Sequence, residues 1–205
     1  MKKSVSLVAA LVIVSVLLGG CARFRRWSYE SGNRDAWQQP ARVIEVLEIP
    51  SGRRLADLGS GGGYFSFRLA EAVGPDGHVY AVDVDADLNE LLAAEIEERG
   101  LTNLETILAD PTDPRLPEDG VDLLFTCNTY HHLPDRVAYF RGLRDRIRPG
   151  GRVAIIDYRY EGFIQKRHAT PAEVVRSEMA EAGYTLTREY DFLERQNFMI
   201  FQVTP

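Results

Sequence analysis

The stretch of residues 55–64 reads Leu55-Ala56-Asp57-Leu58-Gly59-Ser60-Gly61-Gly62-Gly63-Tyr64, with four glycines in the five positions 59–63. Its first half is mostly apolar, as expected of a short buried strand over residues 54–58, and the glycines that follow end the strand in a turn. Residues 65–73 come next with apolar side chains at fourfold spacing, which is typical of a helix. A strand that passes through glycines into a helix predicts one unit of an α/β sheet. A ligand can approach the backbone of such a turn because no Cβ intrudes.

The same alternation continues along the chain. Further strands are expected at residues 78–83, 104–108, 121–126, 152–158, 185–192 and 197–203. Further helices are expected at residues 40–47, 87–99, 135–147 and 170–183. Strands that alternate with helices form a parallel sheet, and the last two strands follow each other as a hairpin. The sequence therefore predicts an α/β three-layer sandwich with a mostly parallel seven-stranded sheet, helices on both faces, and a C-terminal antiparallel hairpin.

The spacing of the glycines separates the classes of nucleotide site. Dinucleotide folds use G-x-G-x-x-G, whose third glycine would fall where Tyr64 stands. A phosphate-binding Walker loop needs Gly-Lys-Ser or Gly-Lys-Thr, and no lysine follows these glycines. What remains is an acid-x-G-x-G-x-G arrangement made by Asp57, Gly59, Gly61 and Gly63.

That arrangement resembles motif I of the class I S-adenosylmethionine-dependent methyltransferases, which have a seven-stranded, Rossmann-like fold. Asp83 and Asp110 end the second and third strands, and residues 147–153, Ile-Arg-Pro-Gly-Gly-Arg-Val, resemble the L-x-P-G-G turn before the fifth strand. The resemblance extends over residues 43–203. It implies that the domain binds S-adenosylmethionine and transfers its methyl group to a small-molecule acceptor by in-line displacement.

The resemblance also implies a role for each matching residue. Asp83 would accept hydrogen bonds from the ribose hydroxyls, the role of a strand-end acid in dinucleotide folds. Asp110 would accept from the adenine amino group, Asp57 would lie near the methionine moiety, and the backbone of Asn128 would hold the methionine amino group. The other residues implied in the cofactor site are Gly59, Ser60, Gly61, Gly63, Tyr64 and Val84. Carboxylates suit a sulfonium cation and two hydroxyls, and a ligand without phosphate requires neither lysine nor metal.

Candidates for the transfer step follow the fourth strand: Tyr130, His131 and His132. Methyl transfer depends mainly on holding donor and acceptor in attack geometry, so the lack of a catalytic triad does not exclude activity. Either histidine is a candidate general base, and the alternative is that it caps or lines the pocket. Adjacent histidines point in different directions and have no Cys-x-x-Cys or His-Glu-x-x-His partner, so no metal site is predicted.

Other side chains are candidates for the acceptor side. Residues 157–159, Asp-Tyr-Arg, can frame an acceptor or cap the end of the fifth strand. Trp37 can roof the site or pack in the core, and residues 159–169 are a predicted substrate lid. Cys127 stands at a strand end and is interpreted as a small buried residue.

The first twenty residues are predicted to be a secretory signal. Lys2 and Lys3 precede an apolar run over residues 5–18, which is short for a membrane-spanning helix. Residues 18–21, Leu-Gly-Gly-Cys, resemble the bacterial lipobox, and that resemblance implies that Cys21 is acylated and becomes the first mature residue. With Cys21 used for lipid, no second cysteine remains for an internal disulfide.

The predicted division is a signal peptide at 1–20, a lipid-anchored tether at 21–35, and the methyltransferase-like domain at 36–205. The protein is then a lipoprotein of the bacterial cell envelope, attached to the membrane through Cys21 and facing the periplasm. The alternative is an uncleaved inner-membrane anchor with the domain in the cytoplasm. Arg23, Arg25 and Arg26 favour this alternative through the positive-inside rule.

Composition limits the partners. The chain has 205 residues, of which 45% are hydrophobic and 26% charged, as in one ordinary globular domain. A net charge of −6 disfavours nucleic acid as a partner.

The methyl donor is made in the cytoplasm, so export leaves a second hypothesis: a non-catalytic envelope protein that binds an adenosine-type ligand on the same fold. The oligomeric state does not follow from the sequence.

Overall fold

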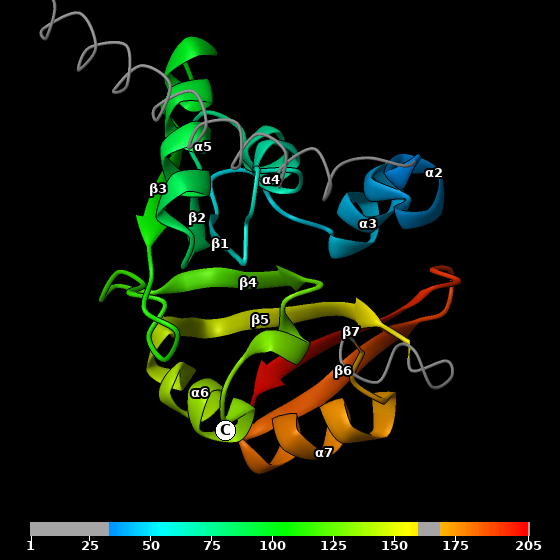
Figure 1. Ribbon diagram of the computed structural model, residues 1–205. Helices are drawn as coiled ribbons and strands as arrows, with labels where there is room; N and C mark the ends of the chain where they lie inside the picture. Colours follow the sequence, from blue (N-terminus) through cyan, green and yellow to red (C-terminus); the bar gives the residue numbers. More distant parts are fainter. Residues whose placement is uncertain (1–32, 160–168, 205) are drawn as a thin grey trace, which may run out of the picture.

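Seven strands form one sheet in the computed structural model, which describes residues 33–159 and 169–204 (Figure 1). Their order across the sheet is β3-β2-β1-β4-β5-β7-β6. Strands β1 to β5 pair in parallel, whereas β7 is antiparallel to both β5 and β6. This confirms the predicted sheet and hairpin. The strands are β1 Arg54–Leu58, β2 His78–Asp83, β3 Leu104–Leu108, β4 Val121–Cys127, β5 Ile147–Tyr158, β6 Tyr184–Tyr190 and β7 Gln196–Val203.

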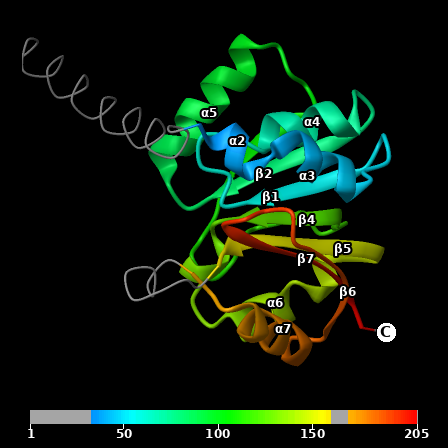
Figure 2. The same ribbon diagram turned by 90° about the vertical axis from the view of Figure 1, so that its right-hand side faces the viewer.

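Helices cover both faces of the sheet, which makes three layers (Figure 2). Helices α3, α4 and α5 pack on one face, and α6 and α7 pack on the other. The α-helices are α2 Arg34–Gln38, α3 Pro40–Leu47, α4 Ser66–Val73, α5 Ala86–Glu98, α6 Arg136–Gly142 and α7 Ala172–Glu181. Two short 3₁₀ helices are η1 Tyr130–His132 and η2 Arg144–Arg146.

The core divides between these two faces because successive strand residues point to opposite sides. In β1, Leu55 joins the cluster under α3 and α4, while Ala56 and Leu58 join the cluster over α6 and α7. Full burial of a leucine side chain such as that of Leu55 contributes roughly 1.5–3 kcal/mol. Burial on both faces explains why β1 is nearly continuously apolar in sequence.

The strand order reverses between β1 and β4, which lie side by side at the centre of the sheet. β2 and β3 extend the sheet on one side of β1, and β4 and β5 extend it on the other. Leu58 at the end of β1 pairs with Thr126 near the end of β4, so the loops that follow both strands meet at the same edge. Ligands of open α/β sheets bind at this kind of switch point.

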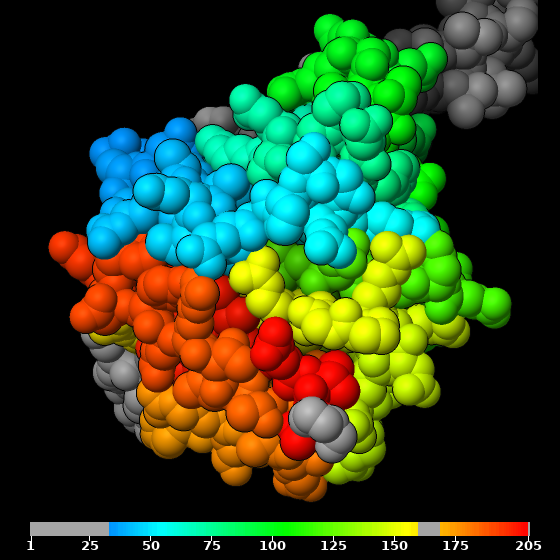
Figure 3. Space-filling model, turned by 180° about the vertical axis from the view of Figure 1, so that it is seen from behind, coloured from blue at the N-terminus to red at the C-terminus, as the bar shows by residue number. Residues whose placement is uncertain are grey.

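Helix α3 and the C-terminal hairpin also lie against each other, although they are distant in sequence (Figure 3). The hydroxyl of Tyr190 donates a hydrogen bond of 3.2 Å to the backbone oxygen of Val46, and Arg188 forms an ion pair of 2.6 Å with Glu48. These contacts place the end of α3 beside β6.

The helix predicted over residues 135–147 is shorter than expected. Helix α6 ends at Gly142, η2 follows, and Ile147 is the first residue of β5, where it pairs with Val121. Phe140, Leu143 and Ile147 all join one apolar cluster. Their spacing in the sequence is that of one continuous helix, so the sequence alone does not show that the helix ends and a strand begins. Pro149, Gly150 and Gly151 consequently lie inside β5.

Within residues 33–159 and 169–204, every helix is too short or too polar to cross a membrane. The predicted signal peptide and tether up to residue 32, including Cys21, lie outside the described residues, as does most of the predicted lid, residues 160–168.

Candidate active site

The glycine turn after β1 has two packed faces and one open face. Gly59 has φ +78°, and an added Cβ would lie 2.0 Å from Oγ1 of Thr129, in the loop after β4. Gly63 has φ +86°, and an added Cβ would lie 2.5 Å from Leu92. Gly61 has φ +54°, and nothing lies within 4 Å of an added Cβ. Gly59 and Gly63 are therefore needed for close packing, whereas Gly61 offers bare backbone to a ligand.

Ser60 and Asp83 present polar groups beside this open backbone. The hydroxyl of Ser60 is buried and has no hydrogen-bond partner among the described residues. The carboxylate of Asp83 accepts 2.8 Å and 2.9 Å hydrogen bonds from the backbone N–H groups of Gly61 and Asp85, one at each oxygen. A carboxylate oxygen can accept a second bond, so Asp83 can hold the turn and still receive a ligand hydroxyl. The orphaned hydroxyl and the open backbone fit a polar nucleoside ligand.

Two apolar side chains stand exposed next to the strand-end acids. Val84 follows Asp83 and is 56% exposed, and Leu108 ends β3 and is 46% exposed. Large exposed apolar groups are informative where they gather at one site, and here both flank the end of the sheet. They offer apolar surface to a flat ring such as adenine.

Asp110, the third acidic residue predicted in the cofactor site, already forms an ion pair with Arg115. Its Oδ2 accepts hydrogen bonds of 2.6 Å and 3.1 Å from the guanidinium of Arg115, which also donates to the backbone oxygen of Leu108 at 3.3 Å. An adenine amino group would therefore share this carboxylate with Arg115. The sequence did not indicate the pair, since an arginine five residues away in a loop has no defined direction.

Asp57 lies at the floor of the site. It is 3% exposed and accepts a 2.6 Å hydrogen bond from the hydroxyl of Ser66. Burial raises the pKa of its carboxyl to about 6, against smaller opposing effects of Ser66 and the Arg34 charge. A cation bound beside this carboxylate would be favoured, because it compensates a buried negative charge.

Asn128 begins the loop after β4 and has a left-handed backbone with φ +59°. Its backbone N–H donates to the oxygen of Ile156 at 2.8 Å, and its side-chain oxygen accepts a 2.6 Å hydrogen bond from Gln196. Gln196 in turn accepts at 3.1 Å from Gln38, and both glutamines are fully buried. A buried chain of amides therefore links α2 to the residue predicted to hold the methionine amino group.

Cys127 lies beside this chain of amides. The amide of Gln38 donates to its Sγ at 2.8 Å, and burial raises the pKa of the thiol to about 12. The thiol is therefore protonated at neutral pH, which agrees with its interpretation as a small buried residue rather than a nucleophile.

Helix α2 covers the glycine turn, and sequence reasoning missed it. The guanidinium of Arg34 lies 3.7 Å above the centre of the Tyr64 ring. Asp35 accepts a hydrogen bond from the hydroxyl of Tyr64 and forms an ion pair of 3.3 Å with Arg68. The predicted boundary at residue 36 thus falls inside an element of the domain. Its five residues, Arg-Asp-Ala-Trp-Gln, have no apolar repeat that would have signalled a helix.

His131 of η1, which follows β4, and Asp157 near the end of β5 form a buried pair. Nδ1 of His131 lies 2.7 Å from Oδ1 of Asp157, and their side chains are 5% and 1% exposed. The second oxygen of Asp157 has no hydrogen-bond partner among the described residues. His132 is exposed, and its ring centre lies 4.0 Å from that of His131. A carboxylate at Nδ1 orients an imidazole and leaves Nε2 as the basic nitrogen.

Tyr130 was predicted as a catalytic candidate, and the structure places it in the core instead. Its ring is fully buried and stacks on Phe140 at 5.5 Å. Its hydroxyl donates at 2.8 Å to Glu178 of α7, which also holds Arg136. Burial and the hydrogen bond to Glu178 raise the pKa of Tyr130, so it is a poor proton donor or acceptor. Tyr130 therefore faces Phe140 of α6 and Glu178 of α7.

No group of three or more histidine, cysteine, aspartate or glutamate side chains in the described part of the chain is arranged to hold a metal ion.

Comparison with known proteins identifies the family. A family model described as a methyltransferase domain matches residues 49–196. The chain belongs to this methyltransferase domain family. It is 33% identical over 113 residues to an aklanonic acid methyltransferase of Streptomyces sp. (strain C5), covering 55% of this chain and 51% of that protein. It is 32% identical over 114 residues to a nocamycin O-methyltransferase of Saccharothrix syringae, covering 56% of this chain and 41% of that protein.

The methyltransferase domain therefore spans about half the length of the curated relatives it matches. Its fold is similar to that of a SAM dependent methyltransferase from Aquifex aeolicus, with a TM-score of 0.80 and 22% identity over 88% of this chain and 97% of that chain. The seven-stranded fold is the one predicted, and the family model confirms a methyltransferase domain.

Proposed function

We propose that this methyltransferase domain transfers the methyl group of S-adenosylmethionine to a small-molecule acceptor, with His131 as general base. The observation that carries the proposal is the placement of a buried His131–Asp157 pair at the sheet edge that also holds the open glycine turn. Family membership supports the cofactor, and the site supports the roles of individual residues.

The residues that would hold the cofactor lie around the switch point. The bare backbone at Gly61, the unpartnered hydroxyl of Ser60 and the carboxylate of Asp83 suit the ribose side. Exposed Val84 and Leu108 suit the faces of adenine. When bound, the cofactor supplies a methyl group on a positively charged sulfur, and the buried carboxylate of Asp57 suits that charge.

His131 would then take the proton of the acceptor. Asp157 keeps the proton of the imidazole on Nδ1 and stabilises the imidazolium that forms, so Nε2 is available as the base. Because this pair is buried, the carboxylate acts in surroundings where its charge is little screened. An acceptor that needs a base is one whose nucleophilic atom carries a proton, such as a hydroxyl.

A small acceptor is supported by the relatives. The relative named as a nocamycin O-methyltransferase is similar over the same domain, and so is the one named as an aklanonic acid methyltransferase. Aromatic side chains at the ends of β4 and β5, His131 and Tyr158, lie with ring centres 6.3 Å apart and suit the wall of a small-molecule pocket.

Calorimetry of the full chain with S-adenosylmethionine tests the cofactor, with a nicotinamide dinucleotide as the comparison ligand. We expect binding of the first and none of the second. Acceptor pools are then screened for release of S-adenosylhomocysteine. Tight nicotinamide binding without S-adenosylmethionine binding would refute the proposal.

We further propose that the domain is a lipoprotein of the bacterial envelope, lipidated at Cys21, with residues 1–20 as signal and the following segment as tether. Lys2, Lys3, the apolar run and the lipobox-like residues 18–21 support this. Palmitate labelling and globomycin-sensitive processing test it, with Cys21→Ser as control. If the wild type incorporates no palmitate and Cys21→Ser has the same electrophoretic mobility as the wild type, the result would favour an uncleaved anchor.

A further inference from the structure

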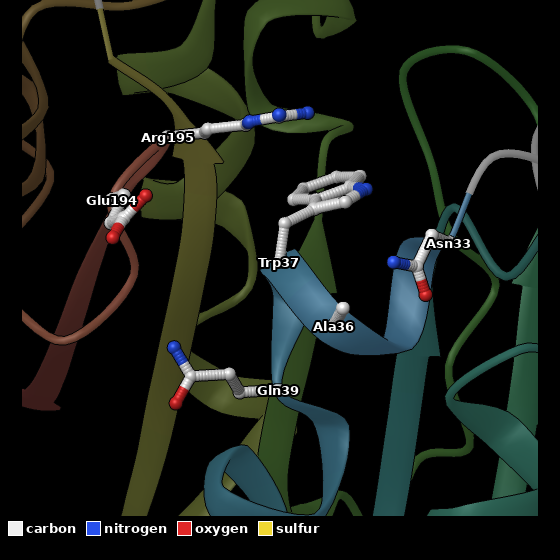
Figure 4. Close-up of a pocket in the computed structure, with 6 residues that line it drawn as sticks. All are labelled: Asn33, Ala36, Trp37, Gln39, Glu194 and Arg195. Atoms are coloured by element: carbon white, nitrogen blue, oxygen red, sulfur yellow. The ribbon is translucent and has the colours of Figure 1, made fainter.

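A pocket lies beside Trp37 of α2. It has a volume of about 300 Å³ and lies between α2 and the turn before β7 (Figure 4). This volume is at the small end of the range for small-molecule sites and suits one or two fused rings. Its lining residues are Asn33, Ala36, Trp37, Gln39, Glu194 and Arg195.

Aromatic contacts connect this pocket to the proposed base. The rings of Trp37 and Tyr158 are stacked, with centres 6.2 Å apart and planes 27° apart. Tyr158 is the residue after Asp157, and its ring centre lies 6.3 Å from that of His131. Two successive ring contacts, Trp37 with Tyr158 and Tyr158 with His131, therefore connect the pocket to the proposed base, so an acceptor that reaches from one to the other must be elongated.

The pocket has a positively charged wall. The guanidinium of Arg195 lies 5.4 Å from the centre of the Trp37 ring and has no carboxylate partner among the described residues. Figure 4 shows Arg195 extending toward the indole, whereas Glu194 lies away from that ring. Burial raises the pKa of the Tyr158 hydroxyl, and the positive charges of Arg34 and Arg195 oppose that rise while the charge of Asp157 adds to it. Arg195 therefore offers a charged partner for an anionic group beside the indole, while Glu194 adds a negative charge elsewhere in the lining.

We propose that this pocket binds the non-reacting part of the methyl acceptor, and that this part is a planar conjugated ring with an acidic group, a carboxylate or phenolate. The ring would lie against the indole of Trp37, and the acid would pair with the guanidinium of Arg195. The inference rests on the proposed function, because it assigns the acceptor class of that same site.

Fluorescence of the full chain carrying Trp27→Phe tests the pocket, since Trp37 is then its sole tryptophan. The probes are 4-nitrobenzoate and its neutral analogue 4-nitrobenzamide, both of which quench indole. We expect 4-nitrobenzoate to bind at least about fivefold more tightly than the amide, because a charge-assisted hydrogen bond to arginine is available to the acid alone. Cyclohexanecarboxylate, which has the charge without the planar ring, should compete weakly.

Two variants assign the preference to one side chain. Arg195→Gln should abolish the difference between acid and amide. Arg42→Gln is the matched control, because Arg42 also lies over an aromatic ring, that of Phe192 at 4.2 Å, but does not line the pocket. Equal binding of acid and amide, or a preference that survives Arg195→Gln, would overturn the inference.

Turnover gives an independent readout of the same proposal. With a hydroxylated aromatic acid as acceptor, Arg195→Gln should raise KM about tenfold and change kcat little, because the arginine holds a part of the acceptor that does not react. A fall in kcat with unchanged KM would contradict it. Calorimetry with S-adenosylmethionine separates the two failures: retained cofactor binding without an acid preference removes this inference alone, whereas lost cofactor binding removes the proposed function.

Discussion

The side-chain amide of Gln196 donates a 2.6 Å hydrogen bond to the side-chain oxygen of Asn128, and the two residues are 68 positions apart in the chain. Gln196 begins β7 at the edge of the hairpin, and Asn128 begins the loop after β4. The bond fixes a left-handed residue whose backbone is predicted to face the methionine end of the cofactor. The C-terminal hairpin thus contributes to the cofactor side of the site.

Gln196→Met tests this relationship. Without the amide, Asn128 is less firmly held in its left-handed conformation, so we expect the affinity for S-adenosylmethionine to fall by about fivefold to tenfold, as for the loss of one buried hydrogen bond. In an Asn128→Gly background, where glycine adopts this conformation without strain, the same substitution should cost much less affinity. Calorimetry of the four chains checks it. Equal losses in both backgrounds would mean that the bond serves stability alone.

Asp57 should make stability depend on pH. Its pKa is about 6 in the folded protein and 3.8 when exposed, so the folded state binds more protons between these values. The penalty for the buried charge is therefore full above pH 6 and disappears as the pH falls toward 4, a change of roughly 3 kcal/mol. Denaturant unfolding should show Asp57→Asn more stable than wild type at pH 7.5 and similar to it near pH 4. A difference that does not vary with pH would contradict this.

Substitution of Gly59 and of Gly61 by alanine should affect different properties, the stability of the domain in the first case and cofactor binding in the second. Gly59→Ala places a Cβ against Thr129, so we expect a loss of several kcal/mol in the free energy of unfolding. Gly61→Ala meets no neighbouring atom and should cost only about 1 kcal/mol for its left-handed backbone. It should nevertheless weaken S-adenosylmethionine binding by at least about tenfold, because its methyl group enters the ligand space. Thermal unfolding and calorimetry together distinguish the two. Normal cofactor affinity in Gly61→Ala would place the ligand elsewhere.

Removal of the base should affect turnover and leave cofactor binding intact. We expect His131→Asn to lower kcat by about 10² or more, the usual range for a general base. Asp157→Asn should also lower kcat, by a smaller factor, because the carboxylate that orients the imidazole is lost. His132→Ala is the matched control, since His132 is adjacent but exposed, and should stay within about threefold of wild type. If His132→Ala is the variant that loses turnover, the base has been assigned to the wrong histidine.

Tyr130→Phe should affect stability and leave catalysis unchanged. The substitution removes the hydrogen bond to Glu178 and keeps the ring that stacks on Phe140. Arg136 still pairs with Glu178, so we expect a loss of about 1 kcal/mol in the free energy of unfolding. Turnover should change by less than about twofold. A large fall in kcat with unaltered stability would restore Tyr130 as a catalytic residue.

Local patterns in the chain were sufficient to predict the sheet and most of its helices, although they missed α2 and the end of α6. The strands at 54–58, 78–83 and 104–108 were predicted with the bounds that the structure has, because their apolar runs are short, buried and bounded by turns. The glycine turn and the acidic residues near it could be predicted from the sequence, because a turn that binds a ligand needs certain residue types at fixed spacing. These features depend on neighbours in sequence, which is why they do not require knowledge of the folded chain.

The partners of polar side chains were decided by tertiary structure. Nothing in the sequence distinguishes buried Gln38 and Gln196 from exposed glutamines, and their contact exists because α2 meets the hairpin beside β4. His131 and Asp157 were each candidates, yet their pairing depends on β4 and β5 being neighbours with aligned ends. A hydrogen bond between distant residues depends on the path of the whole backbone, so pattern and spacing alone cannot specify it.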